Sequence, residues 1–210
     1  MLFNDRFDAA LKLMPCLRKF ENKDGVVYAI PGGGVPVGYY LSKDYNFPME
    51  LLFSKKIVHP ETRESIGAVT LNDQQISSLS RVSKKHIENE VIKIRKLLKD
   101  QQKKFLSNRI PSSVKNKIAF IVDDGITTGN TMLAAISQVK LMKPKKIVIA
   151  VPFASRDSVN KLSQHVDEIV YLRELREASP VRNNYLNFPP VSDKEIVQLL
   201  NATYYTQQVA

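Results

Sequence analysis

Short runs of β-branched and other apolar residues alternate along this chain with stretches whose apolar residues recur at helical spacing. Continuous apolar runs of this length are typical of strands buried on both faces, and their alternation with helices is typical of a parallel sheet. We therefore predict an α/β fold, with a mostly parallel, twisted sheet and helices on both of its faces. The expected strands are residues 26–30, 49–53, 66–71, 117–122, 146–153 and 168–172, and the expected helices between them are residues 35–43, 80–107, 131–142 and 156–165.

The two ends of the chain lie outside this alternating part. Residues 3–14 carry apolar side chains at amphipathic helical spacing, and Ser192 with Glu195 forms a capping-box pattern before a C-terminal helix. We expect the ends to pack together as a small hood on the core. The expected division is a single domain over 1–210, with its core at 25–172 and its hood at 1–24 and 173–210.

The composition excludes several classes of protein. Of the 210 residues, 43% are apolar, and no apolar run approaches the ~20 residues of a membrane span. Asp5 and Asp8 interrupt the N-terminal stretch, which argues against a secretory signal or a transit peptide. The single cysteine, Cys16, cannot form an internal disulfide. These features predict a cytoplasmic protein without a membrane partner.

The charge balance is strongly basic, at +10 with a sequence pI of 9.6, which suits an anionic partner. Much of the excess lies in residues 81–109, which hold ten Lys/Arg against three Asp/Glu. One interpretation of the expected helix 80–107 is an amphipathic helix with a solvated lysine face. The other is a contact with nucleic-acid phosphates. Aromatic residues are sparse there, which disfavours stacking on a single strand.

Two adjacent carboxylates follow an expected strand in the segment IAFIVDDGITTGNTM, residues 118–132. Asp123 and Asp124 thus stand at the carboxyl end of a strand, where open α/β sheets bind ligands. The Gly- and Thr-rich turn after them opens a helix, whose N–H groups and positive dipole end suit a phosphate monoester. The carboxylates suit vicinal hydroxyls, or a Mg²⁺ ion held through water. Sugar hydroxyls together with a phosphate indicate a ribose phosphate.

The structural alternative for this segment is an Asp–Asp helix cap with a glycine turn, because both residue types are common in turns. The full pattern of strand, two acids, Thr-Thr-Gly-x-Thr and helix is more specific than a bare Asp-Asp-Gly. It also differs from a P-loop, which carries a lysine after its second glycine. Here Asn130 follows Gly129.

The segment FIVDDGITTGNTM resembles the phosphoribosyl pyrophosphate (PRPP) signature of type I phosphoribosyltransferases. The segments AIPGGGVPVG, SKKIVHPETRESIGAVTLND and YLNF with SDKEIVQLL resemble, in the same order, those of a poorly characterised bacterial subgroup of predicted phosphoribosyltransferases. The resemblance implies that Asp123 and Asp124 bind the ribose hydroxyls, act in catalysis and hold a metal through water. The residues it implies for the 5-phosphate are Thr127, Thr128, Gly129, Asn130 and Thr131. Gly125 departs mildly, because many members carry an aliphatic residue there.

A second glycine loop, PGGGV at residues 31–35, follows the first expected strand. Alone it reads as a tight turn, although glycine also permits close approach of the backbone to a ligand. The residues that the resemblance implies for the pyrophosphate are Gly33, Gly34, Val35 and Lys56. Lys56 is also a catalytic candidate; without the resemblance, Lys55 and Lys56 are a solvated strand end. Gly32 stands where the subgroup carries arginine, so one cation is missing.

Residues 54–65 read as a polar loop, and the family closes such a loop over PRPP. Its candidate residues are His59, Arg63 and Glu64. The alternative for His59 is an exposed histidine without a special role. The acceptor candidates are the aromatic rings of Tyr185 and Phe188, which could equally be core residues of the hood.

The leading hypothesis is a Mg²⁺-dependent phosphoribosyltransferase, a pentosyltransferase acting in nucleotide metabolism. It would move the ribose 5-phosphate of PRPP to a nucleobase or similar nitrogen acceptor and release pyrophosphate. The expected partners are PRPP and that acceptor, and the expected assembly is a homodimer. The alternative is a non-catalytic, PRPP-sensing regulator that binds nucleic acid through the helix at 80–107. A PRPP synthase shares the phosphate loop but normally needs two such domains.

Overall fold

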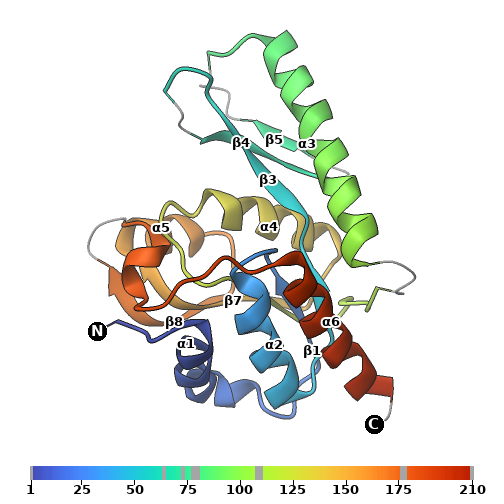
Figure 1. Cartoon of the computed structure of the whole chain (residues 1–210), viewed down its shortest axis with the longest axis vertical. Helices are drawn as coiled ribbons and strands as arrows, with labels where there is room; N and C mark the ends of the chain where they lie inside the picture. Colours follow the sequence, from blue (N-terminus) through green and yellow to red (C-terminus); the bar gives the residue numbers. More distant parts are fainter. Residues whose placement is uncertain are drawn as a thin grey trace.

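The chain folds around a five-stranded parallel sheet (Figure 1). The computed structural model describes residues 2–62, 65–71, 74–76, 81–106, 111–175 and 179–208. The strand order is β2-β1-β6-β7-β8, and each neighbouring pair runs parallel. The strands are β1 (Gly25–Ala29), β2 (Met49–Leu51), β6 (Ile118–Val122), β7 (Lys146–Ser155) and β8 (Glu168–Leu175). The predicted α/β class with a mostly parallel sheet is confirmed.

Helices cover both faces of this sheet. One face carries α1 (Arg6–Leu13), the 3-10 helix η1 (Met14–Phe20), α2 (Gly34–Tyr45) and α6 (Asp193–Gln208), and the other carries α4 (Asn130–Leu141) and α5 (Arg156–Leu162). Alternate strand residues enter the two cores, Phe120 and Val148 the first, Ala119 and Ile147 the second. This period of two is the geometry of a strand. Because both faces are covered, each strand reads as a continuous apolar run.

A second, antiparallel sheet stands outside the central one. It consists of β3 (Ser54–Val58), β4 (Ser65–Thr70) and β5 (Gln74–Ile76), and α3 (Lys84–Phe105) packs against β3 and β4. Figure 1 shows these elements projecting together from the parallel sheet as one arm. Ile57 and Val69 are buried in the same apolar cluster as Leu98 of α3. The arm therefore has its own apolar interior, continuous with the main core.

One prediction about this region is wrong. Residues 54–58, expected to begin a polar loop, form β3, and Lys55 and Lys56 therefore lie inside β3 instead of ending the second strand. The expected strand at 66–71 is present as β4, and it belongs to the antiparallel sheet. In β3, Lys55 and Lys56 are exposed and Ile57 is buried, so only one face of β3 is covered. It consequently lacks the continuous apolar run that marks the other strands.

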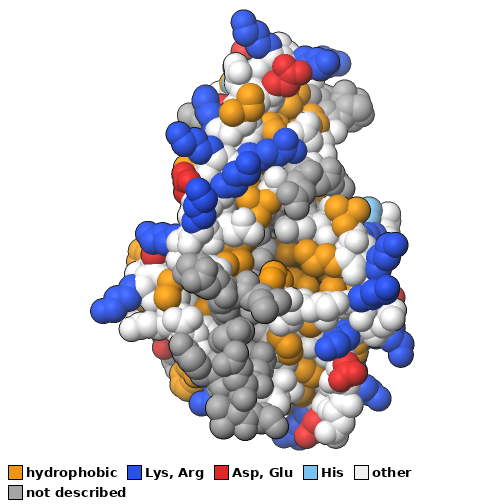
Figure 2. Space-filling model, turned by 90° about the vertical axis from the view of Figure 1, so that its right-hand side faces the viewer, with side chains coloured by type: hydrophobic (Ala, Val, Ile, Leu, Met, Phe, Trp, Pro, Cys, Tyr) orange, Lys and Arg blue, Asp and Glu red, His pale blue; other side chains and the backbone are white. Residues whose placement is uncertain are grey.

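The long helix α3 agrees with the predicted amphipathic pattern. The hydroxyl of Ser83 caps it by accepting the His86 N–H at 3.3 Å. Its buried residues are Val91, Ile94, Leu98 and Phe105. Figure 2 shows Lys and Arg side chains gathered over the arm. Within the described ranges, no helix is long and apolar enough to cross a membrane.

The segment that precedes α1 lies beside residues 184–187, which precede α6. Phe3 pairs with Tyr185 as a parallel bridge, the Phe3 N–H donates to the Asn184 carbonyl at 3.0 Å, and the Leu186 N–H donates to the Phe3 carbonyl at 2.8 Å. Phe3 and Tyr185 also share an apolar cluster with Phe153 at the end of β7. This packing is what the proposed hood requires, because it places the N-terminal segment and residues 184–187 together at the carboxyl edge of the sheet.

Candidate functional site

Two loops meet at the carboxyl ends of neighbouring strands. β1 and β6 are adjacent and in register, with Ala29 opposite Val122. Asp123 and Asp124 directly follow β6, while the glycine turn at residues 31–33 follows β1 and leads into α2. The predicted acid pair and the predicted pyrophosphate loop are thus brought together, at the edge where open α/β sheets bind ligands.

The contact between these loops leaves no room for side chains at two positions. A Cβ on Gly33 would lie 1.7 Å from Oδ2 of Asp124, and a Cβ on Gly34 would lie 2.5 Å from a backbone oxygen of β6. Gly32 has a φ of +98°, in the left-handed region that favours glycine. Val35 is buried, and its N–H donates to the Gly32 carbonyl at 3.2 Å to close the turn. Glycine is therefore required here by both space and backbone conformation.

The two acids have different surroundings. Asp124 is 7% exposed, and its Oδ2 accepts a hydrogen bond from Nε of Arg6 at 2.8 Å. Asp123 is partly exposed, its Oδ1 accepts the Asp124 N–H at 2.9 Å, and within the described residues it has no ion pair. Burial and the neighbouring Asp124 charge raise the pKa of Asp123 well above its usual value. Burial also raises the pKa of Asp124, but Arg6 opposes that rise.

Arg6 of α1 connects the acid pair with residues 188–189, and the sequence did not indicate this role. Its Nη1 donates to the Pro189 carbonyl at 2.7 Å, and its guanidinium carbon lies 3.7 Å from the centre of the Phe188 ring. Arg6 and Asp124 are far apart in sequence, so no local pattern could have indicated the pair. A charged residue among the buried positions of an amphipathic helix was the only available signal.

The predicted acceptor residues pack around this ion pair. Tyr185 is 6% exposed, and its hydroxyl donates to the backbone carbonyl of Asp124 at 2.6 Å. The rings of Tyr185 and Phe188 stack with centroids 5.0 Å apart, and Phe188 also carries Arg6. Both rings therefore contact the groups that hold Asp124: Tyr185 its backbone carbonyl, and Phe188 the Arg6 side chain.

The predicted phosphate loop leads directly into α4. Gly129 caps the helix in the left-handed conformation, with φ +71°. Ile126 pairs with β7 through its N–H and its carbonyl, which anchors the loop on the sheet. Thr128 is exposed, whereas the partly buried members are Thr127, Asn130 and Thr131. Lys161 of α5 donates to Oδ1 of Asn130 at 2.5 Å, which adds a cation that sequence reasoning missed.

The remaining candidates lie on the arm. Lys56 is exposed on β3, opposite Ala68 of β4, and in the described part of the chain it forms no ion pair with the acids. Nδ1 of His59 accepts the N–H groups of Glu61 and Thr62 at 3.2 and 3.3 Å, so this histidine supports its own turn. Arg63 and Glu64 lie outside the described residues. Of the arm candidates that the structure describes, neither Lys56 nor His59 forms an ion pair with the acids.

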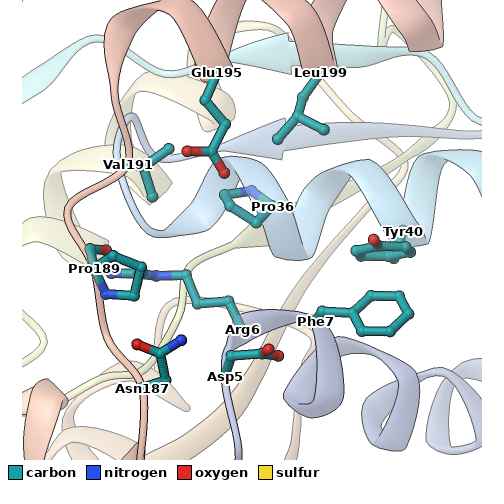
Figure 3. A pocket seen from close by; sticks show the side chains of 10 residues that line it. All are labelled: Asp5, Arg6, Phe7, Pro36, Tyr40, Asn187, Pro189, Val191, Glu195 and Leu199. Atoms are coloured by element: carbon teal, nitrogen blue, oxygen red, sulfur yellow. The ribbon is translucent and has the colours of Figure 1, made fainter.

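A pocket of about 230 Å³ opens beside Arg6, between α1, α2, α6 and residues 187–191 (Figure 3). The rings of Phe7 and Tyr40, with centroids 4.7 Å apart, form one wall. Figure 3 shows the Glu195 side chain extending from α6 toward Pro36 of α2. The pocket therefore combines aromatic and apolar walls with a carboxylate, a combination suited to a small planar molecule that carries N–H groups.

The donor set at the acid pair limits how a metal could be held. Across the described ranges, no group of three or more His, Cys, Asp or Glu side chains lies close enough together to hold a metal. Asp123 and Asp124 supply carboxylates, and one oxygen of Asp124 already accepts Arg6. Such a site fits Mg²⁺ only if substrate oxygens and water complete its octahedral shell, which is the usual arrangement for this ion with phosphates.

Comparison of the chain with known protein families identifies the family to which it belongs. The Phosphoribosyl transferase domain family matches residues 12–175. The chain belongs to that family. The match includes both glycine loops and the acid pair, so the resemblance predicted from the sequence is confirmed.

Relatives of this phosphoribosyl transferase domain agree with the assignment. A Mycobacterium tuberculosis protein, provisionally named a phosphoribosyl transferase, is 31% identical over 209 residues, which is 97% of this chain and 47% of that protein. The chain thus spans about half the length of that relative. A uracil phosphoribosyltransferase of Metallosphaera sedula is 34% identical over 61 residues, 29% of this chain and 28% of that one. The crystal structure of TT1426 from Thermus thermophilus superimposes with a TM-score of 0.83 at 27% identity, covering 95% of this chain and 98% of that one.

Proposed function

We propose that this protein is a Mg²⁺-dependent phosphoribosyltransferase, which moves the ribose 5-phosphate of PRPP to a nitrogen acceptor and releases pyrophosphate. The observation that carries the proposal is the contact between Gly33 and Asp124, which sets the pyrophosphate loop against the ribose acids. PRPP carries a pyrophosphate and a 5-phosphate on opposite sides of its ribose, so its site needs ribose-binding groups between a pyrophosphate loop and a phosphate loop.

Each part of the site has a role in this proposal. Asp123 and Asp124 accept the ribose hydroxyls, and the loop residues Thr127, Thr128, Gly129, Asn130 and Thr131 hold the 5-phosphate. The backbone of Gly33, Gly34 and Val35 faces the pyrophosphate. Lys56 supplies a cation from β3, which requires the arm to move toward the acids. The lid would be the segment 57–65, with His59, Arg63 and Glu64 as its candidate residues.

The reaction is a displacement at the anomeric carbon of the ribose. The acceptor nitrogen forms a bond to that carbon, the carbon–oxygen bond to pyrophosphate breaks, and its electron pair leaves with the pyrophosphate. The acceptor nitrogen gives up its proton to the released pyrophosphate or to water. Positive charge develops on the ribose in the transition state, and the carboxylates of Asp123 and Asp124 stabilise it. Mg²⁺, when bound with PRPP, neutralises charge on the leaving pyrophosphate.

The acceptor we propose is a nucleobase or a similar nitrogen heterocycle. The pocket beside Arg6 supports this class, because Glu195 and Asn187 can accept N–H groups while Tyr40 and Phe7 offer ring surfaces. Tyr185 and Phe188 would act on this pocket indirectly, through their contacts with Asp124 and Arg6. We also propose a homodimer as the assembly and the cytoplasm as the compartment, from the family resemblance and the single cysteine.

Calorimetry with PRPP and Mg²⁺ tests the site. We expect the wild-type protein to bind PRPP, and we expect Asp123→Asn to bind it on the order of 10- to 100-fold more weakly, because ribose hydrogen bonds to a carboxylate are charge-assisted. Equal binding by the two proteins would contradict the site assignment. Incubation with PRPP and a panel of nucleobases, with pyrophosphate release as the readout, then tests the transfer reaction and identifies the acceptor.

The second candidate is a PRPP-sensing regulator that binds nucleic acid without catalysis. It is favoured by the exposed lysines of α3 that form no ion pair within the described residues, Lys85, Lys96, Lys99 and Lys103. A row of unpaired lysines suits a phosphate backbone. The absence of pyrophosphate release with every base, together with salt-sensitive binding of RNA or DNA, would favour this function over transfer.

A further inference from the structure

Arg6 is a buried charge at the first position of α1. It is 9% exposed, and a charge that is this buried is costly unless it is paired and hydrogen-bonded. Its Nε donates to Asp124 at 2.8 Å, its Nη1 donates to the Pro189 carbonyl at 2.7 Å, and its planar face lies 3.7 Å from the centre of the Phe188 ring. Arg6 is therefore fixed by groups from the C-terminal segment and from the acid pair together.

Asp124 is held from several directions as a result. Its Oδ2 accepts a hydrogen bond from Nε of Arg6, and its backbone carbonyl accepts one from the Tyr185 hydroxyl at 2.6 Å. Its carboxylate lies so close to Gly33 that a Cβ on Gly33 would not fit. Asp123 is held less firmly, because its Oδ1 accepts the N–H of Asp124 and its side chain forms no ion pair within the described residues. Arg6 thus forms its ion pair with one member of the acid pair, Asp124.

The charge of Arg6 also matters for an anionic ligand. Adjacent carboxylates repel each other, and together they repel a molecule that carries several phosphate charges. Arg6 offsets one of the two negative charges while it leaves Oδ1 of Asp124 free of the ion pair. An ammonium group could offset the charge, but it lacks the planar fork that stacks on Phe188 and reaches Pro189 as well.

We propose that Arg6 is a positioning residue for PRPP, which fixes Asp124 for the ribose and ties α1 and residues 185–189 onto the bound sugar. This inference rests on the proposed function, because it takes PRPP as the ligand. It makes the Arg6–Asp124 pair the link between the acids and the closed ends of the chain. Binding of the ribose and docking of the chain ends then favour each other.

The link can be tested without any ligand. Hydrogen exchange and thermal unfolding are measured for the wild type, Arg6→Gln, Asp124→Asn and the double variant. We expect both single variants to speed amide exchange in residues 6–13 and 185–189, and we expect the double variant to add little to Asp124→Asn. Additive effects of the two substitutions would show that the residues act independently and would overturn the inference.

PRPP binding tests the positioning role itself. We expect Arg6→Gln to weaken PRPP binding on the order of 10- to 100-fold, because misplaced site groups cost that much, and Arg6→Lys to fall between it and the wild type. Guanidinium chloride at low millimolar concentration should restore part of the binding to Arg6→Ala, whereas the same concentration of sodium chloride should not. The matched control is Lys12→Gln, which removes a charge from the same helix at an ion pair with Asp8.

The outcomes separate this inference from the proposed function. If the wild type binds PRPP and Arg6→Gln binds it equally well, the role of Arg6 is overturned and the function stands. Tighter binding by Arg6→Gln would mean that Arg6 blocks Asp124, which also overturns it. If the wild type does not bind PRPP, the proposed function fails, and the PRPP role of Arg6 fails with it.

Discussion

A Cβ on Gly33 would lie 1.7 Å from the Asp124 carboxylate, whereas a Cβ on the preceding Gly32 would meet no atom within 4 Å. Gly33→Ala must therefore displace Asp124, and we expect it to destabilise the fold by about 1–3 kcal/mol and to weaken PRPP binding strongly. Gly32→Ala imposes a left-handed alanine, at a cost of about 1–2 kcal/mol, without touching the acid. Urea unfolding and PRPP calorimetry compare the two. Equal losses of PRPP affinity would contradict the importance of the Gly33–Asp124 contact.

The open space at Gly32 leads to a gain-of-affinity prediction. The resemblance noted in the sequence implies arginine at this position, and the backbone there has φ +98° in this chain. Gly32→Arg and Gly32→Ala share the same backbone strain, so the difference between them isolates the guanidinium. We expect Gly32→Arg to bind pyrophosphate about tenfold more tightly than Gly32→Ala, because a charge-assisted hydrogen bond contributes on this scale. Indistinguishable affinities would place the pyrophosphate away from this loop.

Gly125 and Phe153 give a packing prediction. The resemblance noted in the sequence implies an aliphatic residue at the position of Gly125, and here a Cβ on it would lie 2.2 Å from the Phe153 ring. The ring thus occupies the space that the aliphatic side chain would fill. We expect Gly125→Ala to cost about 1–3 kcal/mol in unfolding free energy, and Phe153→Leu to recover part of that cost in the double variant. Additive destabilisation in a urea-unfolding cycle would show that the two positions do not share this space.

The sequence predicted those parts of the molecule that local patterns encode. The parallel strands were predictable because burial on both faces makes each a continuous apolar run, as in β6 and β7. The acid pair and the loop after it were predictable because they are continuous in sequence, from the end of β6 to the start of α4. Lys55 and Lys56 hid β3, since a strand with one exposed face has no such run. Arg6 was not predictable, because its contact with Asp124 exists only after both ends of the chain have packed together.

Glu168 gives a prediction about acid stability. At the start of β8 it bridges Lys146, at 3.1 Å, and Lys19 of η1. Burial raises the pKa of Glu168, but the hydrogen bonds from the two lysines outweigh burial and lower it below the ordinary value of 4.5. A carboxyl whose pKa is lower in the folded state stabilises the fold above its unfolded pKa. That contribution is lost as the pH falls through the folded value.

We therefore expect Glu168→Gln to lower the unfolding free energy by about 0.5–1 kcal/mol at neutral pH, a modest effect because Lys19 is exposed to solvent. The difference from the wild type should shrink as the pH falls below 4.5, and it should also shrink in high salt. The control is Glu21→Gln, because Glu21 is exposed and forms no ion pair in the described part of the chain. Urea unfolding at several pH values makes the measurement. A constant difference between Glu168→Gln and the wild type at all pH values would mean that the side chain stabilises the fold by packing and not through its charge.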